Sequence, residues 1–164
     1  MNILAAFYAV LHTVFAITVH EYAHAYAARE MGDRTAERAG RLTLNPLAHV
    51  DWLFSIVVPI VTWLLLGVPV GACKPVPVAP WEYSSRGKGE ILVSLAGPAA
   101  NLVLASNFAI GLLVPNDPLL HQIAAFGVRV NLALALFNLL PIPGLDGWNA
   151  MKGAWRMWRA WAAR

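Results

Sequence analysis

The residues most able to do chemistry form an HExxH pattern, His20-Glu21-Tyr22-Ala23-His24. On an α-helix, residues four positions apart lie on one face, so both imidazoles can bind the same Zn²⁺ ion. Glu21 follows the first histidine and can reach a zinc-bound water without binding the metal itself. Zinc lowers the pKa of that water towards neutrality, and a nearby carboxylate takes its proton as it attacks a carbonyl. The pattern therefore predicts metal-assisted hydrolysis with Glu21 as the general base.

A catalytic zinc site needs a third protein ligand and one open coordination position. The best candidate for the ligand is Asp146, at the end of the segment NLLPIPGLDG. Pro141, Pro143 and Gly144 interrupt the helical pattern just before it, so a carboxylate beyond the break can turn towards the metal. Two neutral imidazoles and one carboxylate leave the site with net positive charge, which also stabilises a developing oxyanion.

The elements that must position these residues are strongly apolar. Of the 164 residues, 59% are hydrophobic and 13% are charged. Soluble domains are about half apolar and about a quarter charged, so this composition predicts a membrane protein. A net charge of +3 is too small to indicate a nucleic-acid partner. The single cysteine, Cys73, excludes both an intramolecular disulfide and a metal site built from several thiolates.

Four apolar stretches, residues 2–28, 52–70, 91–114 and 119–140, are candidates for membrane segments. The first, third and fourth meet the roughly 20-residue length that a spanning helix needs. The second is shorter and is interrupted by Pro59, Gly67 and Pro69. Because the first stretch carries the HExxH motif, we interpret it as a retained span and not as a cleaved targeting peptide. We expect an all-α integral membrane protein with a three-helix transmembrane core, a re-entrant or additional hydrophobic segment, and a short extended or β segment.

The distribution of lysine and arginine predicts the topology. If all four stretches crossed the bilayer, the loops on one side would hold four basic residues and those on the other side seven. If residues 52–70 instead enter the membrane and return, all eleven lie on one side. The positive-inside rule favours this re-entrant path. It places residues 29–51, residues 71–90 and the C-terminus in the cytoplasm.

Residues 148–164 carry an apolar set and a basic set at helical spacing. The apolar set is Met151, Trp155, Trp158 and Ala162, and the basic set is Lys152, Arg156, Arg159 and Arg164. This pattern predicts an interfacial helix. We therefore divide the chain into a core, residues 1–147, and a basic, Trp-rich interfacial helix, residues 148–164.

Five motifs occur in an order that resembles the site-2 protease family of intramembrane zinc metalloproteases, in its compact bacterial-type branch without a PDZ domain. They are HEYAHAYAAREMGD (20–33), GRLTLNPLAHVD (40–51), ACKPVPV (72–78), AGPAAN (96–101) and FNLLPIPGLDG (137–147). The resemblance covers residues 19–147, most of the chain. The chain departs from the branch at Gly144, where a second proline is usual before Leu-Asp-Gly.

The resemblance implies a role for each matching residue. His20, His24 and Asp146 would bind Zn²⁺, and Glu21 would be the general base. Asn138 matches an asparagine that orients the substrate or polarises its carbonyl. Asn101 matches one expected near the site, and it too is assigned to contact with the substrate or the oxyanion. The pair Gly97-Pro98 is interpreted as a helix-packing element. An extended segment would pair as an edge strand with an unwound substrate; its residues are Lys74, Pro75, Val76, Pro77 and Val78.

The function that the resemblance implies is regulated intramembrane proteolysis in a prokaryotic cell membrane. The partners would be the lipid bilayer and a transmembrane helix of a membrane-anchored substrate, while the oligomeric state stays open. The alternative is a zinc binder without catalysis, such as a transporter subunit or a pseudoprotease, and a third hypothesis is a structural scaffold. A transporter should carry more ionisable residues in its third and fourth stretches than Arg129 and His121. A pseudoprotease should have lost Glu21 or a ligand.

Overall fold

The computed structural model describes residues 3–50, 57, 61, 65 and 74–164, and all regular structure in that part is helical. The elements are α1 (Ile3–Glu30), α2 (Thr35–Arg38), the 3₁₀ helix η1 (Pro46–His49), α4 (Arg86–Gly111), α5 (Pro118–Asn138) and α6 (Asp146–Ala162). The predicted all-α class is confirmed. Within the described residues no β-strand occurs, so the segment 74–79 has neither helix nor strand pairing.

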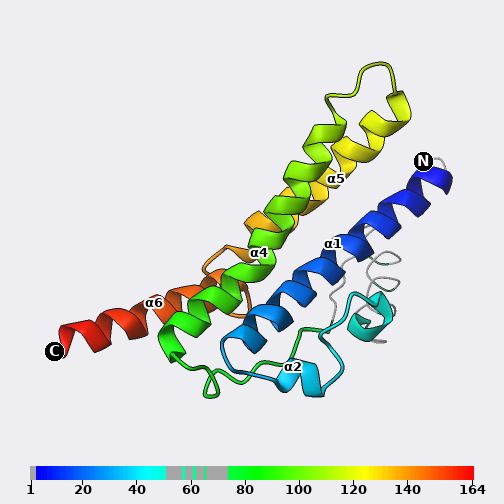
Figure 1. The fold of residues 1–164 in the computed structure, drawn as a ribbon. Coiled ribbons are helices and arrows are strands. Elements are labelled where there is room, and N and C mark those ends of the chain that lie inside the picture. The colour runs from blue at the N-terminus through cyan, green and yellow to red at the C-terminus, as the bar shows by residue number, and fades with distance from the viewer. Residues whose placement is uncertain (1–2, 51–56, 58–60, 62–64, 66–73) are drawn as a thin grey trace.

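Helix α4 is the central element and packs against α1, α5 and α6. Its direction is antiparallel to that of α1 and to that of α5, and the axes of the three helices are roughly parallel (Figure 1). The buried face of α4 repeats every four residues and consists mainly of small side chains: Gly89, Val93, Gly97, Asn101 and Ala105. Small residues at this spacing let neighbouring helix backbones approach closely.

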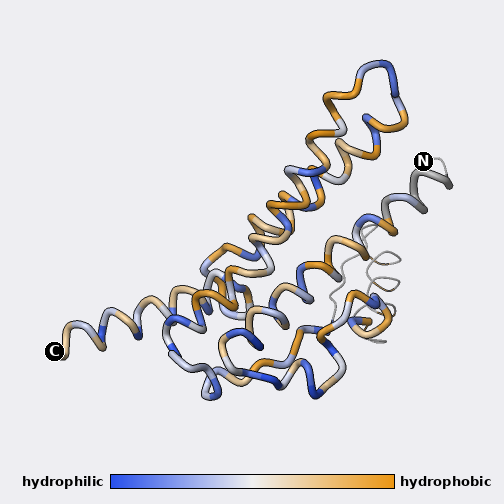
Figure 2. Tube along the Cα trace, in the orientation of Figure 1, coloured by the Kyte–Doolittle hydropathy of each residue, from blue (hydrophilic) through white to orange (hydrophobic). Residues whose placement is uncertain are grey.

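Two of the predicted spans correspond to helices that are long and apolar enough to cross a membrane, α4 and α5. Figure 2 shows largely apolar colouring along both, with hydrophilic residues in the loop that joins them. The first predicted span corresponds to α1, which has 28 residues. That α1 also crosses the membrane, completing a three-helix transmembrane core, stays a prediction.

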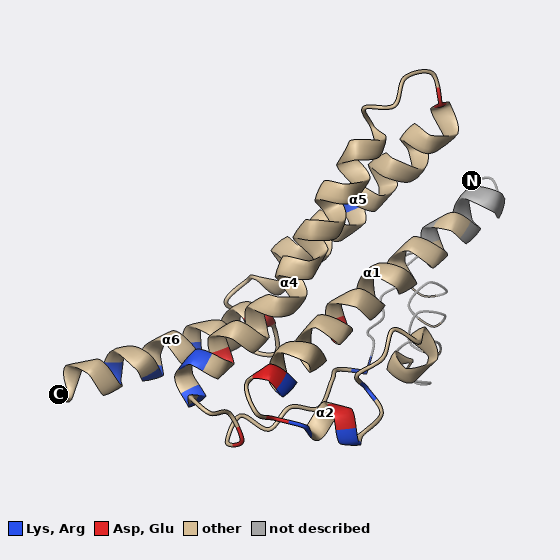
Figure 3. Cartoon of the chain, viewed as in Figure 1, with Lys and Arg blue, Asp and Glu red and all other residues tan. Residues whose placement is uncertain are grey.

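Charged residues gather at the end of the bundle where α2 and α6 lie, as Figure 3 shows. The backbone N–H of Lys74 donates to the carbonyl of His49, the last residue of η1, at 3.1 Å. Residues 49 and 74, on either side of the largely undescribed stretch, are therefore adjacent. The predicted re-entrant stretch itself, residues 52–70, lies outside the described residues except for 57, 61 and 65.

Candidate metal centre

His20, His24 and Asp146 come together from two helices that are far apart in the sequence. The two Nε2 atoms lie 3.0 Å apart, and Asp146 Oδ2 lies 3.3 Å from that of His20 and 3.2 Å from that of His24. Ligand atoms at the tetrahedral zinc distance of about 2.0–2.1 Å lie roughly 3.3 Å from one another. The three atoms are therefore spaced as the ligands of a single zinc-sized ion.

Hydrogen bonds on the far side of each ring leave both Nε2 atoms able to bind a cation. His20 Nδ1 donates to Asn101 Oδ1 at 2.5 Å, and His24 Nδ1 donates to the Val93 carbonyl at 2.7 Å. A neutral imidazole that donates from Nδ1 carries its lone pair on Nε2. Two lone pairs and a carboxylate oxygen then face one another, and Asp146 Oδ2 is buried without a hydrogen-bond partner. A cation between them removes this repulsion, so the donor set fits Zn²⁺.

Gly97 of α4 leaves the space that such an ion requires. A Cβ atom built on Gly97 would lie 2.6 Å from His20 Nε2 and still closer to His24 Nε2. Any side chain at this position would therefore enter the region between the two imidazoles and α4. The sequence predicted only a packing role for Gly97, and its contact with both histidines is an addition to that role.

Asp146 reaches the histidines because the chain turns sharply after α5 and begins α6 at this residue. Gly144 in the turn has φ +99°, in the left-handed region. Proline, which holds φ near −65°, cannot adopt this conformation, so this chain requires glycine where the family usually has proline. Gly147 is needed for close approach, because a Cβ there would collide with the Leu139 carbonyl oxygen.

Exchanging Gly144 should therefore affect metal binding in a graded way. Gly144→Ala is expected to cost about 1–2 kcal/mol of stability through left-handed strain. Gly144→Pro should move Asp146 away and reduce zinc per chain strongly. The matched control is Gly40→Ala, at a loop position with φ +66° and no atom within 4 Å of the added Cβ. Metal analysis and thermal unfolding check this: Gly40→Ala should lose some stability and keep its zinc. Full zinc content in Gly144→Pro would contradict the assignment.

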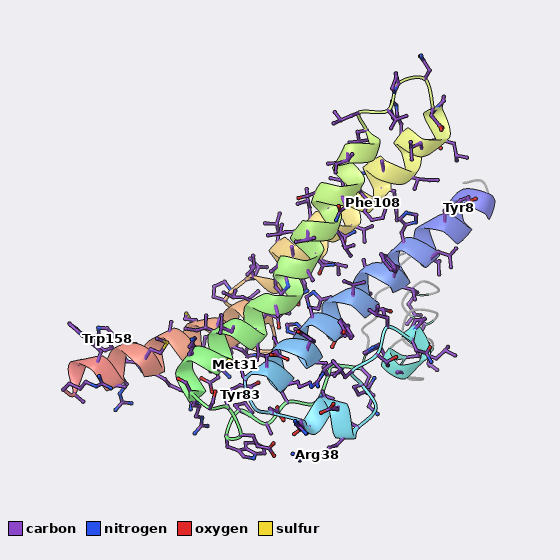
Figure 4. The ribbon with its side chains drawn as sticks, viewed as in Figure 1. Tyr8, Met31, Arg38, Tyr83, Phe108 and Trp158 are labelled. Carbon is purple, nitrogen blue, oxygen red and sulfur yellow. The ribbon has the colours of Figure 1, made fainter. Side chains whose placement is uncertain are left out.

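Glu21 lies on the same cleft as the three metal-binding candidates. The cleft has a volume of about 320 Å³, and its lining includes His20, Glu21, His24, Val76, Tyr83, Asn138 and Asp146. Glu21 Oε2 accepts a hydrogen bond from the backbone N–H of Val76 at 2.9 Å. Tyr83, which also lines the cleft, is buried in one cluster with Ala28 and Val93 and lies close to Met31 (Figure 4).

The charges around the cleft are set by burial and by neighbouring groups. Burial raises the pKa of the Tyr83 phenol, and the charges of Asp33 and Glu90 raise it further. Tyr83 consequently stays protonated.

Backbone N–H groups attach the segment of residues 74–78 and the adjacent Ala79 to α1 and to the loop that follows α1. Val76 donates to Glu21, and the next residue after the segment, Ala79, donates to the buried Asp33 Oδ2 at 2.6 Å. Pro75 and Pro77 have no N–H. In the extended conformation that the sequence predicts, alternate residues point their polar groups to the same side. The outer edge of this segment would then offer the carbonyls of Pro75 and Pro77 and no N–H donor, and both the conformation and its pairing with a substrate stay predictions.

The two predicted substrate asparagines lie in different places. Asn138 lines the cleft and donates one amide hydrogen to the Leu134 carbonyl at 2.9 Å. Asn101 is fully buried behind His20, at 0% exposure. Its amide nitrogen donates to the Ala16 carbonyl at 3.2 Å and to Asn131 Oδ1 at 2.8 Å. The sequence predicted that Asn101 contacts the substrate or the oxyanion. Because its amide oxygen and both amide hydrogens are used in these bonds, Asn101 is instead placed to orient His20.

Asn131 was missed by the sequence interpretation. It is 1% exposed, accepts from Asn101, and donates to the Gly127 carbonyl at 2.9 Å. A buried hydrogen-bond chain thus crosses from α5 through α4 to His20 on α1. The sequence did contain one signal for Asn131: it is an amide within an apolar span, seven residues before Asn138. Polar residues inside a membrane are costly, so such a residue indicates a function.

Removal of this chain should weaken metal binding. Asn101→Leu is expected to lower zinc affinity by about 10- to 100-fold, the usual loss when a partner of a histidine ligand is removed. Asn131→Leu should have a smaller effect because it acts through Asn101. Competition with a chelator measures both. Asn107→Leu is the matched control, since Asn107 is exposed on α4 and donates to the local Val103 carbonyl. If Asn101→Leu and Asn107→Leu bind zinc equally well, the orienting role is wrong.

Fold and site together indicate the class: a helical protein with two candidate membrane spans and a His₂Asp group that could hold a metal ion beside a glutamate, the donor arrangement of a metallohydrolase. Comparison with curated proteins identifies the group within that class. The chain belongs to the site-2 protease-like family of zinc metalloproteases. The zinc predicted from the sequence is confirmed as the metal of this family.

The relatives cover most of this chain. It is 37% identical over 155 residues to YwhC of Bacillus subtilis, a proposed zinc metalloprotease, across 88% of this chain and 68% of that protein. It is 37% identical over 145 residues to Rip2 of Mycolicibacterium smegmatis, a proposed zinc metalloprotease, across 85% of this chain and 54% of that protein. A proposed zinc metalloprotease of Methanocaldococcus jannaschii is 32% identical over 134 residues, 81% of this chain and 63% of that protein. The chain thus spans between about half and two thirds of these relatives. No protein-family model matches the chain, and no solved structure matches it significantly.

Proposed function

We propose that this chain is an intramembrane zinc metalloendopeptidase that hydrolyses peptide bonds in or near transmembrane segments of membrane-anchored substrates. The observation that carries the proposal is the convergence of His20 Nε2, His24 Nε2 and Asp146 Oδ2 within 3.3 Å of one another in a cleft that Glu21 also lines. The apolar helices α4 and α5, which are long enough to cross a membrane, support an intramembrane location.

The residues of the chain divide the chemical work. His20, His24 and Asp146 would hold Zn²⁺, which when bound would supply the Lewis acidity that polarises a carbonyl and acidifies water. Glu21 takes a proton from the attacking water as its oxygen forms a bond to the carbonyl carbon. When the C–N bond breaks, Glu21 gives that proton to the leaving amine. The Val76 N–H holds the Glu21 carboxylate in one orientation.

Substrate binding uses the other side of the cleft. A peptide bond inside a helix is shielded by its own backbone, so a substrate span has to unwind locally before it enters. The carbonyls of Pro75 and Pro77 can then accept hydrogen bonds from the unwound strand. One amide hydrogen of Asn138 donates to the Leu134 carbonyl, and among the described residues the second has no acceptor. This second hydrogen can therefore donate to the substrate carbonyl.

The topology we propose puts the charged end of the bundle in the cytoplasm. The hydrogen bond between Lys74 and His49 supports a re-entrant path for the stretch between them. His20 lies ten residues before the end of α1, about 15 Å along the helix. The metal centre is therefore on the cytoplasmic half, and water reaches it through the polar cleft and not from the lipid.

Cleavage of a membrane-embedded reporter tests the proposal. Purified chain in lipid nanodiscs is mixed with single-span reporter proteins whose spans contain helix-breaking residues, and products are identified by mass spectrometry. We expect cleavage within the span, loss of cleavage when a zinc chelator is added, and recovery when zinc is restored. Cleavage that survives complete removal of the metal, or that occurs only in the soluble part of the reporters, would overturn the proposal.

A further inference from the structure

Helix α6 presents a surface that continues beyond the metal centre, and Lys152 lies at the border, where it also lines the cleft. Of its residues, all of which the structure describes, Gly153 alone is fully buried. It lies against α4, where a Cβ would approach the Gly87 carbonyl oxygen to 2.7 Å. Arg156 Nε forms an ion pair with Glu90 Oε2 of α4 at 3.1 Å. Beyond these contacts the helix runs away from the bundle, and Trp158 lies near its free end (Figures 1 and 4).

Basic and aromatic side chains run next to each other along this surface. They line a groove of about 550 Å³, whose residues are Trp148, Met151, Lys152, Trp155, Arg156 and Arg159. Trp155 and Trp158 contact each other with ring centroids 4.8 Å apart, and both are more than half exposed, at 57% and 53%. The only acid in α6 is Asp146, which faces the metal centre. We name the six groove residues the basic–aromatic face.

We propose that the basic–aromatic face of α6 binds the headgroups of anionic phospholipids, an inference that rests on the proposed location in a membrane. Indole rings favour the headgroup level of a bilayer, where one end of the ring is wet and the other apolar. Lysine and arginine next to them attract phosphate, and each such residue strengthens binding to an anionic surface by roughly fivefold. A purely protein partner of acidic character would match the cations but would leave the exposed indoles and Met151 without an apolar surrounding.

Headgroup binding has a consequence for the metal centre. Asp146 is the first residue of α6, and Gly153, the point of contact with α4, lies between Asp146 and half of the basic–aromatic face, namely Trp155, Arg156 and Arg159. Lipid bound on the far side of this contact holds the orientation of the whole helix, since a helix moves as one rod. Anionic lipid should therefore slow the loss of zinc from the protein.

The lipid preference is measured with full-length protein in phosphatidylcholine nanodiscs that contain equal fractions of brominated phosphatidylglycerol or brominated phosphatidylcholine. Bromine quenches nearby tryptophan fluorescence, so we expect stronger quenching by the anionic lipid. In the double variant Lys152→Gln/Arg159→Gln this preference should fall by roughly fivefold for each cation removed. The charge-matched control, Arg34→Gln/Arg38→Gln on and beside α2, should keep it.

Equal quenching by both lipids in the unmodified protein would overturn the proposal and would assign the face to a protein partner. Equal loss of the lipid preference in both double variants would also overturn it.

A second measurement follows zinc loss to a chelator in discs with and without phosphatidylglycerol. Slower loss with the anionic lipid is expected, and identical rates would overturn the link to the metal centre. Neither readout needs proteolysis, so a protein that shows the lipid preference but cleaves nothing would contradict the proposed function and not the lipid surface.

Discussion

Replacing Glu21 with glutamine is expected to abolish nearly all peptide hydrolysis while the protein keeps its zinc. A positioned general base contributes on the order of 10²–10⁴-fold to a reaction rate, and the glutamine amide cannot take a proton from water. Glutamine can still accept the hydrogen bond that the Val76 N–H donates to Glu21, so the local structure should survive. The measurement is the rate of reporter cleavage together with zinc per chain.

The matched control for this variant is Glu30→Gln, the same chemical change at an exposed position of α1. It should alter neither the rate nor the metal content. Two results would contradict the assignment of Glu21. Cleavage at near the original rate would show that another group moves the proton, and loss of zinc in Glu21→Gln would make Glu21 part of the metal site.

A single methyl group at position 97 is expected to empty the metal centre, although Gly97 offers no ligand. The Cβ of Gly97→Ala would collide with the Nε2 atoms of both His20 and His24. These atoms are at the ends of side chains that can rotate, so the helices can still pack while the imidazoles turn away. We therefore expect a folded protein with little zinc and no proteolysis.

Three measurements test this effect: helical circular dichroism, zinc per chain and reporter cleavage. Gly111→Ala is the control, because it adds the same atom to the same helix and its nearest neighbour, Ala124 Cβ, would be 3.2 Å away. The control should keep its zinc. Normal zinc content in Gly97→Ala would mean that α4 does not approach the histidines as closely as described.

The sequence predicted those parts of the site that depend on local pattern. The spacing of His20 and His24 is a property of one helix, and the proline break before Asp146 is visible in the chain itself. The helices α4 and α5 were predicted for the same reason, since their apolar length alone indicates them. Their ends were displaced: α4 begins at Arg86, five residues before the predicted span, and α5 ends at Asn138. Apolar composition marks the membrane segment, but the helix of α4 continues through the polar residues before it.

The parts that could not be predicted depend on which backbones come together. Asn131 has no motif of its own, and its role exists only because α5 packs against α4 at the level of Asn101. The bond from Val76 to Glu21 joins segments 55 residues apart. Gly144 was identified as a departure from the family, but only its φ of +99° explains why glycine is required there.

The central claim, that His20, His24 and Asp146 hold one zinc ion, is tested most directly by zinc per chain in protein purified without chelators. The comparison is between the unmodified chain, Asp146→Ala and the control Asp117→Ala, which removes an aspartate that caps α5 away from the site. We predict about one zinc per chain in the unmodified protein and in the control, and a sharp loss in Asp146→Ala, as expected for a site with three protein ligands. An undiminished zinc content in Asp146→Ala, or no zinc in the unmodified protein, would contradict the claim.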